Sequence, residues 1–566
     1  MKRVALSLCL ALLLLASASS HAQYFGKNKV QYTNFNWQYV QSEHFNVYYT
    51  DGGEEIAAFV LETAEESYRH LQKSFRYQLT DRIKIILHNS HNDFQQTNVD
   101  LSEPEESVGG FTEFFKNRVV IPYDGEWEKF RHVIHHELTH AVMLQMLYGS
   151  GAQQIITGIT QMQVPLWFIE GLAEYESRGW DIESDMYMRD ATVNGYVPDI
   201  PYLNAFLAYK GGQSVWNYMV ERYGQEKVGE ILGKVKVNKN FDRGLKQAIG
   251  LEVDDLTKRW HRYLKRKYWP DVENRSEPEE IAKRLTDHRK DGSFVNTSPA
   301  LSNRGDKLVF KSDKSDFFDI YMMSAIDGRI LKRLVKGQRA GNLEELQWLK
   351  GPGMSWSPDD KQVVFTARAS GGDAIYIVDV KKSKITKTYK LDLDGIYNPS
   401  WSPKGDEIAF TGLKNGQSDI YLFNLQTKAL RNLTNDLFSD VEPNWAPDGG
   451  KLIFASDRGD REAASLPEGF KPQHLNMKNM DIYELAVESG AVTQVVAGPF
   501  SERVPVYAAD GKTIAFSSER QGVSNIWLRN LESGEEWPIT NVLTGAYQPT
   551  WGGNADRLVF ISFYFA

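Results

Sequence analysis

Cysteine is almost absent from this sequence. Its 566 residues include one, Cys9, which lies close to the N-terminus within an apolar stretch. If that stretch is removed on export, no disulfide can hold the chain together and no metal site can use a thiolate ligand. The fold must then depend on its apolar core, and a metal would be bound through histidine and carboxylate groups.

Long apolar runs are also missing beyond the N-terminus. Residues 4–16 form such a run, which follows Lys2 and Arg3 and precedes the small-residue cleavage pattern Ser-His-Ala at 20–22. The pattern predicts a secretory signal peptide over residues 1–22, with a short membrane anchor as the alternative. We therefore expect an exported protein, periplasmic or extracellular, without stable membrane insertion.

The sequence has no basic block. Its formal net charge is -9, and its 42% apolar and 25% charged residues are ordinary for a globular protein. This balance argues against nucleic acid as a partner. The chain is too long for one ordinary core, so two or more domains are expected.

Residues 23–275 combine two hydrophobic periodicities. Alternation predicts strands at 45–49, 83–87 and 118–122, whereas helical spacing predicts helices at 54–75, 129–147, 165–177, 212–223 and 253–268. This mixture indicates an α+β domain that ends in helices. A charged linker over residues 276–290 follows it.

A repeat fills residues 291–566. The unit Asn398-Pro-Ser-Trp-Ser-Pro-Lys-Gly-Asp-Glu-Ile-Ala-Phe has relatives that begin near residues 298, 353, 442, 504 and 548. A short strand, a Pro-Asp-Gly type of turn and a returning strand, repeated every 40–45 residues or so, are typical of a propeller blade. The units resemble the TolB-type propeller, which implies an all-β six-bladed β-propeller.

The last repeat is irregular. The sequence stops after its second strand, and residues 281–287 resemble the last-strand segment 429–435. Residues 281–287 could therefore supply an outer strand that closes the ring, although a third strand would still be missing. Either the last blade is incomplete or the sequence is part of a longer protein.

The chemistry is concentrated at residues 135–140, His-His-Glu-Leu-Thr-His. His136 and His140 are four residues apart, so on a helix both imidazoles project from one face and can bind one zinc ion. Glu137 is then placed to act as general base. The alternative, a histidine pair on a surface helix, is weakened by the apolar residues that flank the motif.

A second apolar helix at about 165–177 carries two carboxylates four residues apart, Glu170 and Glu174. Buried acids are costly unless they bind a metal or a partner. We interpret Glu170 as the third zinc ligand and Glu174 as an acceptor for the free nitrogen of a zinc-bound histidine; a solvated surface acid is the alternative for Glu174. With three ligands assigned, His88 and His91 are interpreted as turn residues.

The pairing of His-Glu-x-x-His with Trp-x-x-Glu-Gly-x-Ala at 167–173 resembles the gluzincin peptidases, especially their aminopeptidase-N-like branch. More broadly, residues 40–270 resemble the peptidase MA-like group, with a zincin-like fold. The resemblance implies that Glu170 is a metal ligand. It also implies that Tyr209, in Tyr-Lys-Gly-Gly, stabilises the tetrahedral intermediate. The alternative for Tyr209 is a core or surface tyrosine at a helix start.

Two departures from that branch bear on substrate choice. The spacer between His140 and Glu170 is long, at 29 residues, and the Gly-x-Met-Glu-Asn segment that binds a substrate amino terminus is absent; Glu113, in Gly-Gly-Phe-Thr-Glu, is out of frame. Exopeptidase activity is therefore in doubt. The strand at 118–122 could instead act as the edge strand with which an extended peptide pairs.

Two functions follow from these patterns. The leading hypothesis is an exported zinc metallopeptidase that hydrolyses a peptide or protein substrate, with the propeller binding the substrate or a protein partner. The alternative is a TolB-like protein-binding scaffold with a non-catalytic peptidase-like half. The sequence favours the enzyme because all five residues of the catalytic set are present: His136, Glu137, His140, Glu170 and Tyr209.

Overall fold

The computed structural model describes residues 31–98, 104–113, 116–337, 343–461, 466–467, 469–475, 479–553 and 557–564. The expected signal peptide at residues 1–22, with Cys9, lies outside these ranges. Within them, no helix has both the length and the apolar character needed to cross a membrane.

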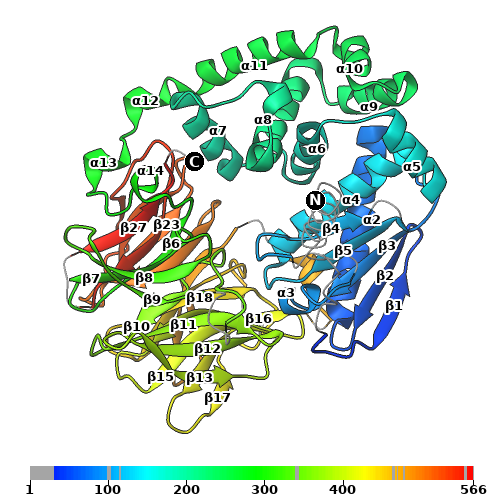
Figure 1. The fold of residues 1–566 in the computed structure, drawn as a ribbon. Helices are drawn as coiled ribbons and strands as arrows, with labels where there is room; N and C mark the ends of the chain where they lie inside the picture. The colour runs from blue at the N-terminus through cyan, green and yellow to red at the C-terminus, as the bar shows by residue number, and fades with distance from the viewer. Residues whose placement is uncertain are drawn as a thin grey trace, which may run out of the picture.

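A five-stranded sheet forms the base of the N-terminal domain (Figure 1). Its order is β1 (Trp37–Gln41), β2 (Phe45–Thr50), β3 (Ile83–His88), β5 (Arg118–Pro122) and β4 (Phe111–Glu113). The three central strands are parallel, and the two edge strands are antiparallel to their neighbours. Strand β5 is therefore internal, so our expectation that 118–122 forms the edge was wrong; the short strand β4 takes that place.

Two long helices pack together against this sheet. They are α2 (Glu54–Phe75) and α4 (Trp127–Tyr148), and each contributes fully buried apolar residues to one core. The buried positions of α2, from Ile56 to Phe75, recur at three- and four-residue intervals, which is the spacing of one helix face. The helix that carries the histidine motif is thereby fixed along most of its length.

A helical layer completes the domain. It contains α3 (His91–Phe94), α5 (Ala152–Gln161), α6 (Leu166–Arg178), α7 (Ile182–Val193), α8 (Ala205–Tyr223), α9 (Lys227–Asn238), α10 (Phe241–Ile249) and α11 (Val253–Tyr268). Helices α6 and α8 pack closely together, and α4 lies against α6. In Figure 1 the helices from α5 to α11 lie above the sheet and arch toward the propeller, whereas the short α3 lies lower, beside β5.

The described residues of the C-terminal part form a propeller with five four-stranded blades. Blade one comprises β6 (Asn296–Leu301), β7 (Lys307–Ser312), β8 (Asp319–Ser324) and β9 (Ile330–Val335), and blade two β10 (Met354–Trp356), β11 (Gln362–Ala369), β12 (Gly372–Asp379) and β13 (Lys384–Lys390). Blade three comprises β14 (Gly395–Trp401), β15 (Glu407–Lys414), β16 (Gln417–Asn424) and β17 (Leu430–Asn432). Blade four comprises β18 (Asp440–Trp445), β19 (Lys451–Ser456), β20 (Asp481–Ala486) and β21 (Val492–Val496), and blade five β22 (Glu502–Tyr507), β23 (Thr513–Ser518), β24 (Asn525–Asn530) and β25 (Glu536–Pro538).

Six blades were expected, and that number was wrong. The sixth repeat forms a two-stranded sheet of β26 (Ala546–Trp551) and β27 (Leu558–Ser562). Residues 281–287 do not complete it, because the structure has no strand there; α13 (Pro278–Ile281) precedes an irregular segment, followed by α14 (His288–Asp291). That segment still packs near the sixth repeat, since Leu285 and Val559 contact the same apolar cluster.

The repeated residues join neighbouring blades. The Trp356 indole donates to the carbonyl of Ala300 in blade one at 2.9 Å, and the Trp445 indole donates to the carbonyl of Ser400 in blade three at 3.1 Å. Near the start of the third strand of blade three, the Asp419 carboxylate accepts a hydrogen bond of 3.1 Å from the backbone N–H of Asp436, in the loop that leads to the next blade. These recurrent residues therefore have a structural role.

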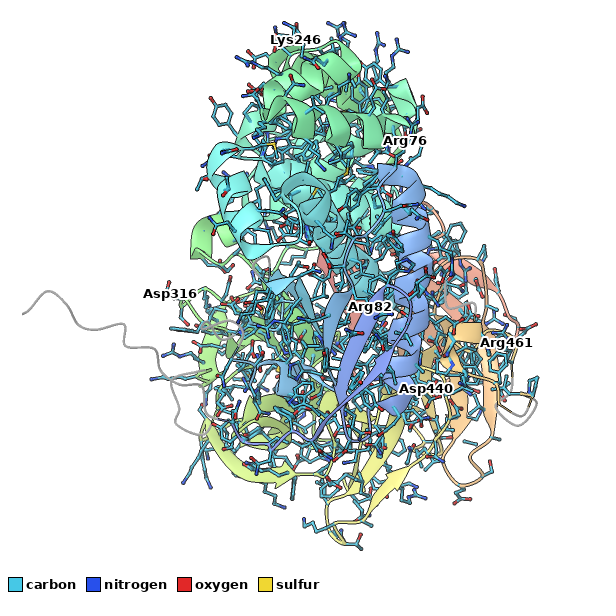
Figure 2. All side chains as sticks on the ribbon, turned by 90° about the vertical axis from the view of Figure 1, so that its right-hand side faces the viewer. Arg76, Arg82, Lys246, Asp316, Asp440 and Arg461 are labelled. Carbon is cyan, nitrogen blue, oxygen red and sulfur yellow. The ribbon has the colours of Figure 1, made fainter. Side chains whose placement is uncertain are left out.

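The propeller is joined to the N-terminal end of α4. Glu126 immediately precedes α4, and its carboxylate accepts from Arg503 of β22 at 2.8 Å. Arg503 also lies 3.2 Å from Glu442 of β18. The Trp127 indole donates to the carbonyl of Leu437 at 3.3 Å. Figure 2 shows the side where α2 stands beside the propeller, with Arg461 at the edge of blade four. The histidine helix is thus anchored in both domains.

Candidate active site

Helices α4 and α6 bring the three expected ligands together. The Nε2 atoms of His136 and His140 are 3.1 Å apart, and Glu170 Oε2 lies 3.2 Å from His140 Nε2 and 3.5 Å from His136 Nε2. The two histidines stand one turn apart on α4, as their spacing predicts. Glu170 reaches them from α6, which packs against that turn.

These three atoms fit the base of a tetrahedral zinc site. Zinc binds histidine nitrogen and carboxylate oxygen at about 2.0–2.2 Å, so two ligand atoms of a tetrahedral site should be about 3.3–3.5 Å apart. The observed separation of 3.5 Å lies within that range, and those of 3.1 and 3.2 Å lie just below it. The donor set, two imidazoles and a carboxylate, is that of many catalytic zinc sites.

The electrostatics of the site also favour a cation. Burial alone would lower the pKa of His136, but the carboxylates of Glu170, Glu174 and Glu137 raise it to about 10. The pKa of Glu170 falls to about 2, because the two histidines outweigh the effect of its burial. Without a metal, the carboxylates thus hold a proton on His136, and a bound divalent cation would replace that charge.

Glu137 faces the edge strand. The Thr112 hydroxyl, on β4, donates to Glu137 Oε2 at 2.7 Å and lies 3.0 Å from the Glu137 carbonyl oxygen. The Glu137 side chain is largely buried, but it lines a cavity that opens between the N-terminal domain and the propeller. Neighbouring Glu113 instead accepts from Arg118 at 2.6 Å. The role of Thr112 was not predicted from the sequence. The only hint was its position one residue before Glu113, which is out of frame as a candidate substrate-binding residue.

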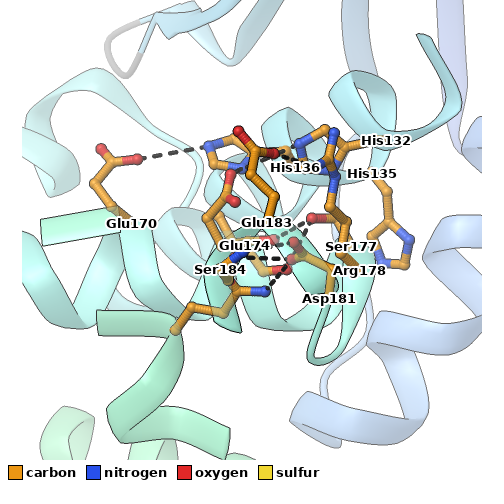
Figure 3. Close-up of polar contacts among 12 residues, drawn as sticks. His132, His135, His136, Glu170, Glu174, Ser177, Arg178, Asp181, Glu183 and Ser184 are labelled. Carbon is orange, nitrogen blue, oxygen red and sulfur yellow. Dashed lines mark hydrogen bonds and ion pairs between the residues drawn. The ribbon is translucent and has the colours of Figure 1, made fainter. Parts of the chain in front are cut away.

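Glu174 lies behind His136. Its Oε1 atom is 3.1 Å from His136 Nδ1, and its Oε2 atom accepts from Lys210 Nζ at 3.0 Å. Figure 3 shows Glu174 between the histidines of α4 and the polar residues at the end of α6. The carboxylate is buried, and although burial alone would raise its pKa, His136 and Lys210 hold it low. The contact between Lys210 and Glu174 was not predicted, because no spacing pattern in the sequence points to a lysine that follows Tyr209.

His132 extends the histidine row by one turn. Its Nε2 atom lies 3.6 Å from Glu174 Oε1, and burial strongly lowers its pKa. With His136 and Glu174 it forms a second group whose atoms lie close enough to hold a metal. This group shares His136 with the first; Glu170 lies nearest Nε2 of that imidazole and Glu174 nearest Nδ1. The four-residue spacing of His132 and His136 was the signal in the sequence.

Tyr209 lies within α8 and not at a helix start. Its ring stacks on His136 at a centroid distance of 6.3 Å and an interplanar angle of 13°. Burial and the nearby carboxylates, Glu170 foremost, raise the pKa of Tyr209 far above its usual value, so the phenol keeps its proton. The side chain is half-buried and lines the cavity that also exposes Glu137.

His88 and His91 are not part of this site. His88 ends β3 and His91 begins α3, and neither lines the cavity. His88 is enclosed by the rings of Phe35, Trp37 and Phe94, and burial lowers its pKa to about 3. It is a neutral core histidine.

Comparison with known families agrees with this geometry. Residues 63–266 match the Peptidase MA superfamily, and residues 355–463 match the TolB beta propeller domain. The chain joins a Peptidase MA domain to a TolB-type propeller. The aminopeptidase-N-like subtype of the Peptidase MA domain stays a prediction.

Individual relatives match short parts of the chain. The uncharacterized protein Atu1656 of Agrobacterium fabrum is 27% identical over 119 residues, which cover 21% of this chain and 34% of that protein. The uncharacterized peptidase YuxL of Bacillus subtilis is 24% identical over 124 residues, which cover 22% of this chain and 17% of that protein. The chain thus spans about a third or less of the length of these relatives.

Two solved structures resemble the chain weakly. TolB from Acinetobacter baumannii is 19% identical, covers 51% of this chain and 60% of its own, and has a TM-score of 0.30. An oligogalacturonate lyase from Vibrio parahaemolyticus is 12% identical, covers 49% of this chain and 89% of its own, and also has a TM-score of 0.30. At these values the two structures add nothing to the assignment.

A cavity of about 1640 Å³ opens between the Peptidase MA domain and the propeller. One wall holds the three expected ligands, Glu137, Tyr209 and β4. The other is formed by residues of the 278–288 segment, of blade one and of the sixth repeat, with Ile539 and Thr540 just before that repeat. It exceeds the roughly 300–1,000 Å³ typical of small-molecule pockets. The space is therefore large enough for an extended segment of several residues.

Proposed function

We propose that this chain is an exported zinc-dependent peptidase that cleaves peptides in the cavity between its two domains. The observation that carries the proposal is the triangle of His136, His140 and Glu170 atoms at tetrahedral spacing beside the Glu137 carboxylate. His136, His140 and Glu170 would hold the zinc. When bound, zinc supplies a Lewis acid for the scissile carbonyl and for water.

The residues of the chain supply the proton transfers. Glu137 accepts a proton from the attacking water and returns it to the nitrogen of the leaving amine, as a general base and then a general acid. Thr112 fixes one oxygen of this carboxylate, which leaves the other free for the water. Because its pKa is raised, the Tyr209 phenol is protonated and can donate to the oxygen on which negative charge develops.

Strand β4 supports a peptide as the substrate. It is the edge of the sheet, and its residues Phe111 and Thr112 line the cavity beside Glu137. An unpaired edge can add one more strand through main-chain hydrogen bonds, so an extended peptide can lie along β4 whatever its sequence. This pairing would bring a peptide bond to the Glu137 carboxylate.

The direct test is digestion of a peptide library by the purified full chain. We expect about one zinc per chain by metal analysis, cleavage at defined sites, loss of cleavage with a chelator and recovery when zinc is added back. The cut positions distinguish endopeptidase from exopeptidase activity. If a folded, zinc-loaded chain cleaves nothing, the proposal fails and the protein-binding scaffold becomes the better account.

A further inference from the structure

The loop between β9 of blade one and β10 of blade two reaches from the propeller into the Peptidase MA domain. Glu106 Oε2, in the segment that leads to β4, accepts the backbone N–H groups of Trp348 at 2.5 Å and Leu349 at 3.2 Å. The backbone N–H of Glu106 donates to Glu345 of the loop at 3.0 Å. One part of the loop is thus tied beside the edge strand.

The other part of the loop is tied beside the histidine helix. Lys350 Nζ donates to the carbonyl of Asp124 at 2.6 Å, three residues before α4 begins. The Trp348 ring stacks on Phe318 of the propeller at 4.8 Å and 15°. Leu349 lies between these fixed points, so its backbone position is set by contacts on both sides.

The Leu349 side chain is nevertheless exposed. It is 46% accessible and lines the same cavity as Glu137, together with Val108 and Val133 of the Peptidase MA domain. Val133 stands one turn before Glu137 on α4, and a Cβ on Gly109 would lie 3.3 Å from it, so the 108–109 segment touches this part of the helix. A fixed, uncovered leucine in the wall of a cleft favours an apolar occupant.

We infer that Leu349, with Val108 and Val133, forms a substrate subsite that accepts a large apolar side chain of the peptide. The inference rests on the proposed peptidase function. A peptide paired with β4 projects successive side chains to opposite sides, and those on one side would meet the propeller wall. Specificity at one fixed position from the scissile bond would then come from a residue of the propeller.

The test compares cleavage-site preferences of zinc-loaded full-length variants on one peptide library. For the wild type we expect Leu, Ile, Met or Phe to be preferred over Ala and Ser at one position from the cut. Leu349→Ser should reduce this preference by about 10-fold, because the apolar contact between the Leu349 side chain and the substrate is lost. The change should raise KM more than it lowers kcat. Leu349→Glu should shift the preference at that position toward Lys and Arg.

Leu430→Ser is the matched control, because Leu430 is 37% exposed on β17, the outer strand of blade three, and does not line the cavity. It should leave the profile unchanged. If Leu349→Ser and Leu349→Glu cleave with the wild-type profile, the subsite inference is overturned while the peptidase proposal stands. If the wild type itself cleaves nothing, the peptidase proposal fails first, and the subsite with it.

Discussion

Gly171 of α6 and Gly212 of α8 cross in backbone contact. A Cβ added to Gly171 would lie 2.2 Å from the carbonyl carbon of Gly212, and a Cβ added to Gly212 would lie 2.2 Å from the carbonyl oxygen of Trp167. Glu170 immediately precedes the first glycine, and Tyr209 lies one turn before the second. The glycine contact therefore sets the distance between Glu170 on α6 and Tyr209 on α8.

Gly171→Ala should destabilise the protein although alanine is the better helix former. The added methyl group would overlap backbone atoms of α8, which cannot rotate away, so we expect a loss of roughly 1–3 kcal/mol or more in unfolding free energy. Gly233→Ala on α9 is the control, since its Cβ would meet nothing within 4 Å. It should stabilise by up to about 1 kcal/mol. Denaturant unfolding of both variants measures this, and equal effects would contradict the contact.

Glu137→Gln separates catalysis from metal binding. The amide keeps the size of the side chain but cannot accept a proton, so we expect kcat to fall by a factor on the order of 10²–10⁴ while zinc content and melting temperature stay near wild type. The control is Glu62→Gln, at an exposed position of α2. Wild-type turnover in Glu137→Gln would exclude the assigned role.

Glu170 and Glu174 should differ in their effect on zinc affinity. Glu170→Gln removes a charged ligand and should nearly abolish zinc binding. Glu174→Gln removes the acceptor next to His136 Nδ1 and should weaken affinity by about 10–100-fold. Competition with a chromophoric chelator measures both. If Glu174→Gln weakened zinc more than Glu170→Gln, the second group, with His132, would be the better metal site.

Arg503→Met tests the joint between the domains. The change leaves the buried carboxylate of Glu442 without its cation, whereas the partly buried Glu126 keeps Lys129 at 2.6 Å. We therefore expect a cost toward the lower end of the about 3–5 kcal/mol typical of a broken buried pair. Lys512→Met, which breaks an exposed pair with Glu532, should leave the melting temperature near wild type, because solvent screens that pair. Thermal unfolding of the two variants gives the comparison. A small effect for Arg503→Met would show that the joint contributes little.

Asp457 should make stability depend on pH. Burial, with Asp440 and Glu126 nearby, raises its pKa to about 7, so the folded state binds a proton that the unfolded state releases near pH 4. Between about pH 4 and pH 7 the folded state binds one more proton than the unfolded state, so the free energy of unfolding falls as the pH rises through this interval. Asp457→Asn should gain roughly 1–4 kcal/mol relative to wild type at pH 8 and flatten this slope. Asp392→Asn, at a fully exposed position, should keep the wild-type slope.

Local patterns were sufficient to predict much of the fold. The helix at 54–75 and the strand at 118–122 have the predicted bounds, because buried positions follow the helix and strand periods. The sequence did not predict the start of α8 at Ala205. Two adjacent glycines lower helix propensity. Gly212 is needed for close contact with α6, and Gly211 for contact with Leu203, and a single sequence reveals neither contact.

The residues of the candidate site also fall into those that local sequence patterns predict and those that depend on tertiary packing. The histidines and Glu137 follow from spacing on one helix, whereas Thr112 and Lys210 reach the site through tertiary packing. The predicted number of blades was wrong for a related reason. The sixth repeat has the sequence of a blade, but a blade also needs its outer strands, and no further strand pairs with β27 in the described part of the chain.

The joint between Glu126 and Arg503 also bears on the order of assembly. Its partners are 377 residues apart, and contacts of such long range form late because a large loop must close first. The fifth blade must be synthesised before the N-terminal end of the histidine helix acquires this anchor. A nascent chain therefore carries the histidine motif long before its surroundings are complete, and this end of the helix reaches its final packing only after Arg503 has been synthesised.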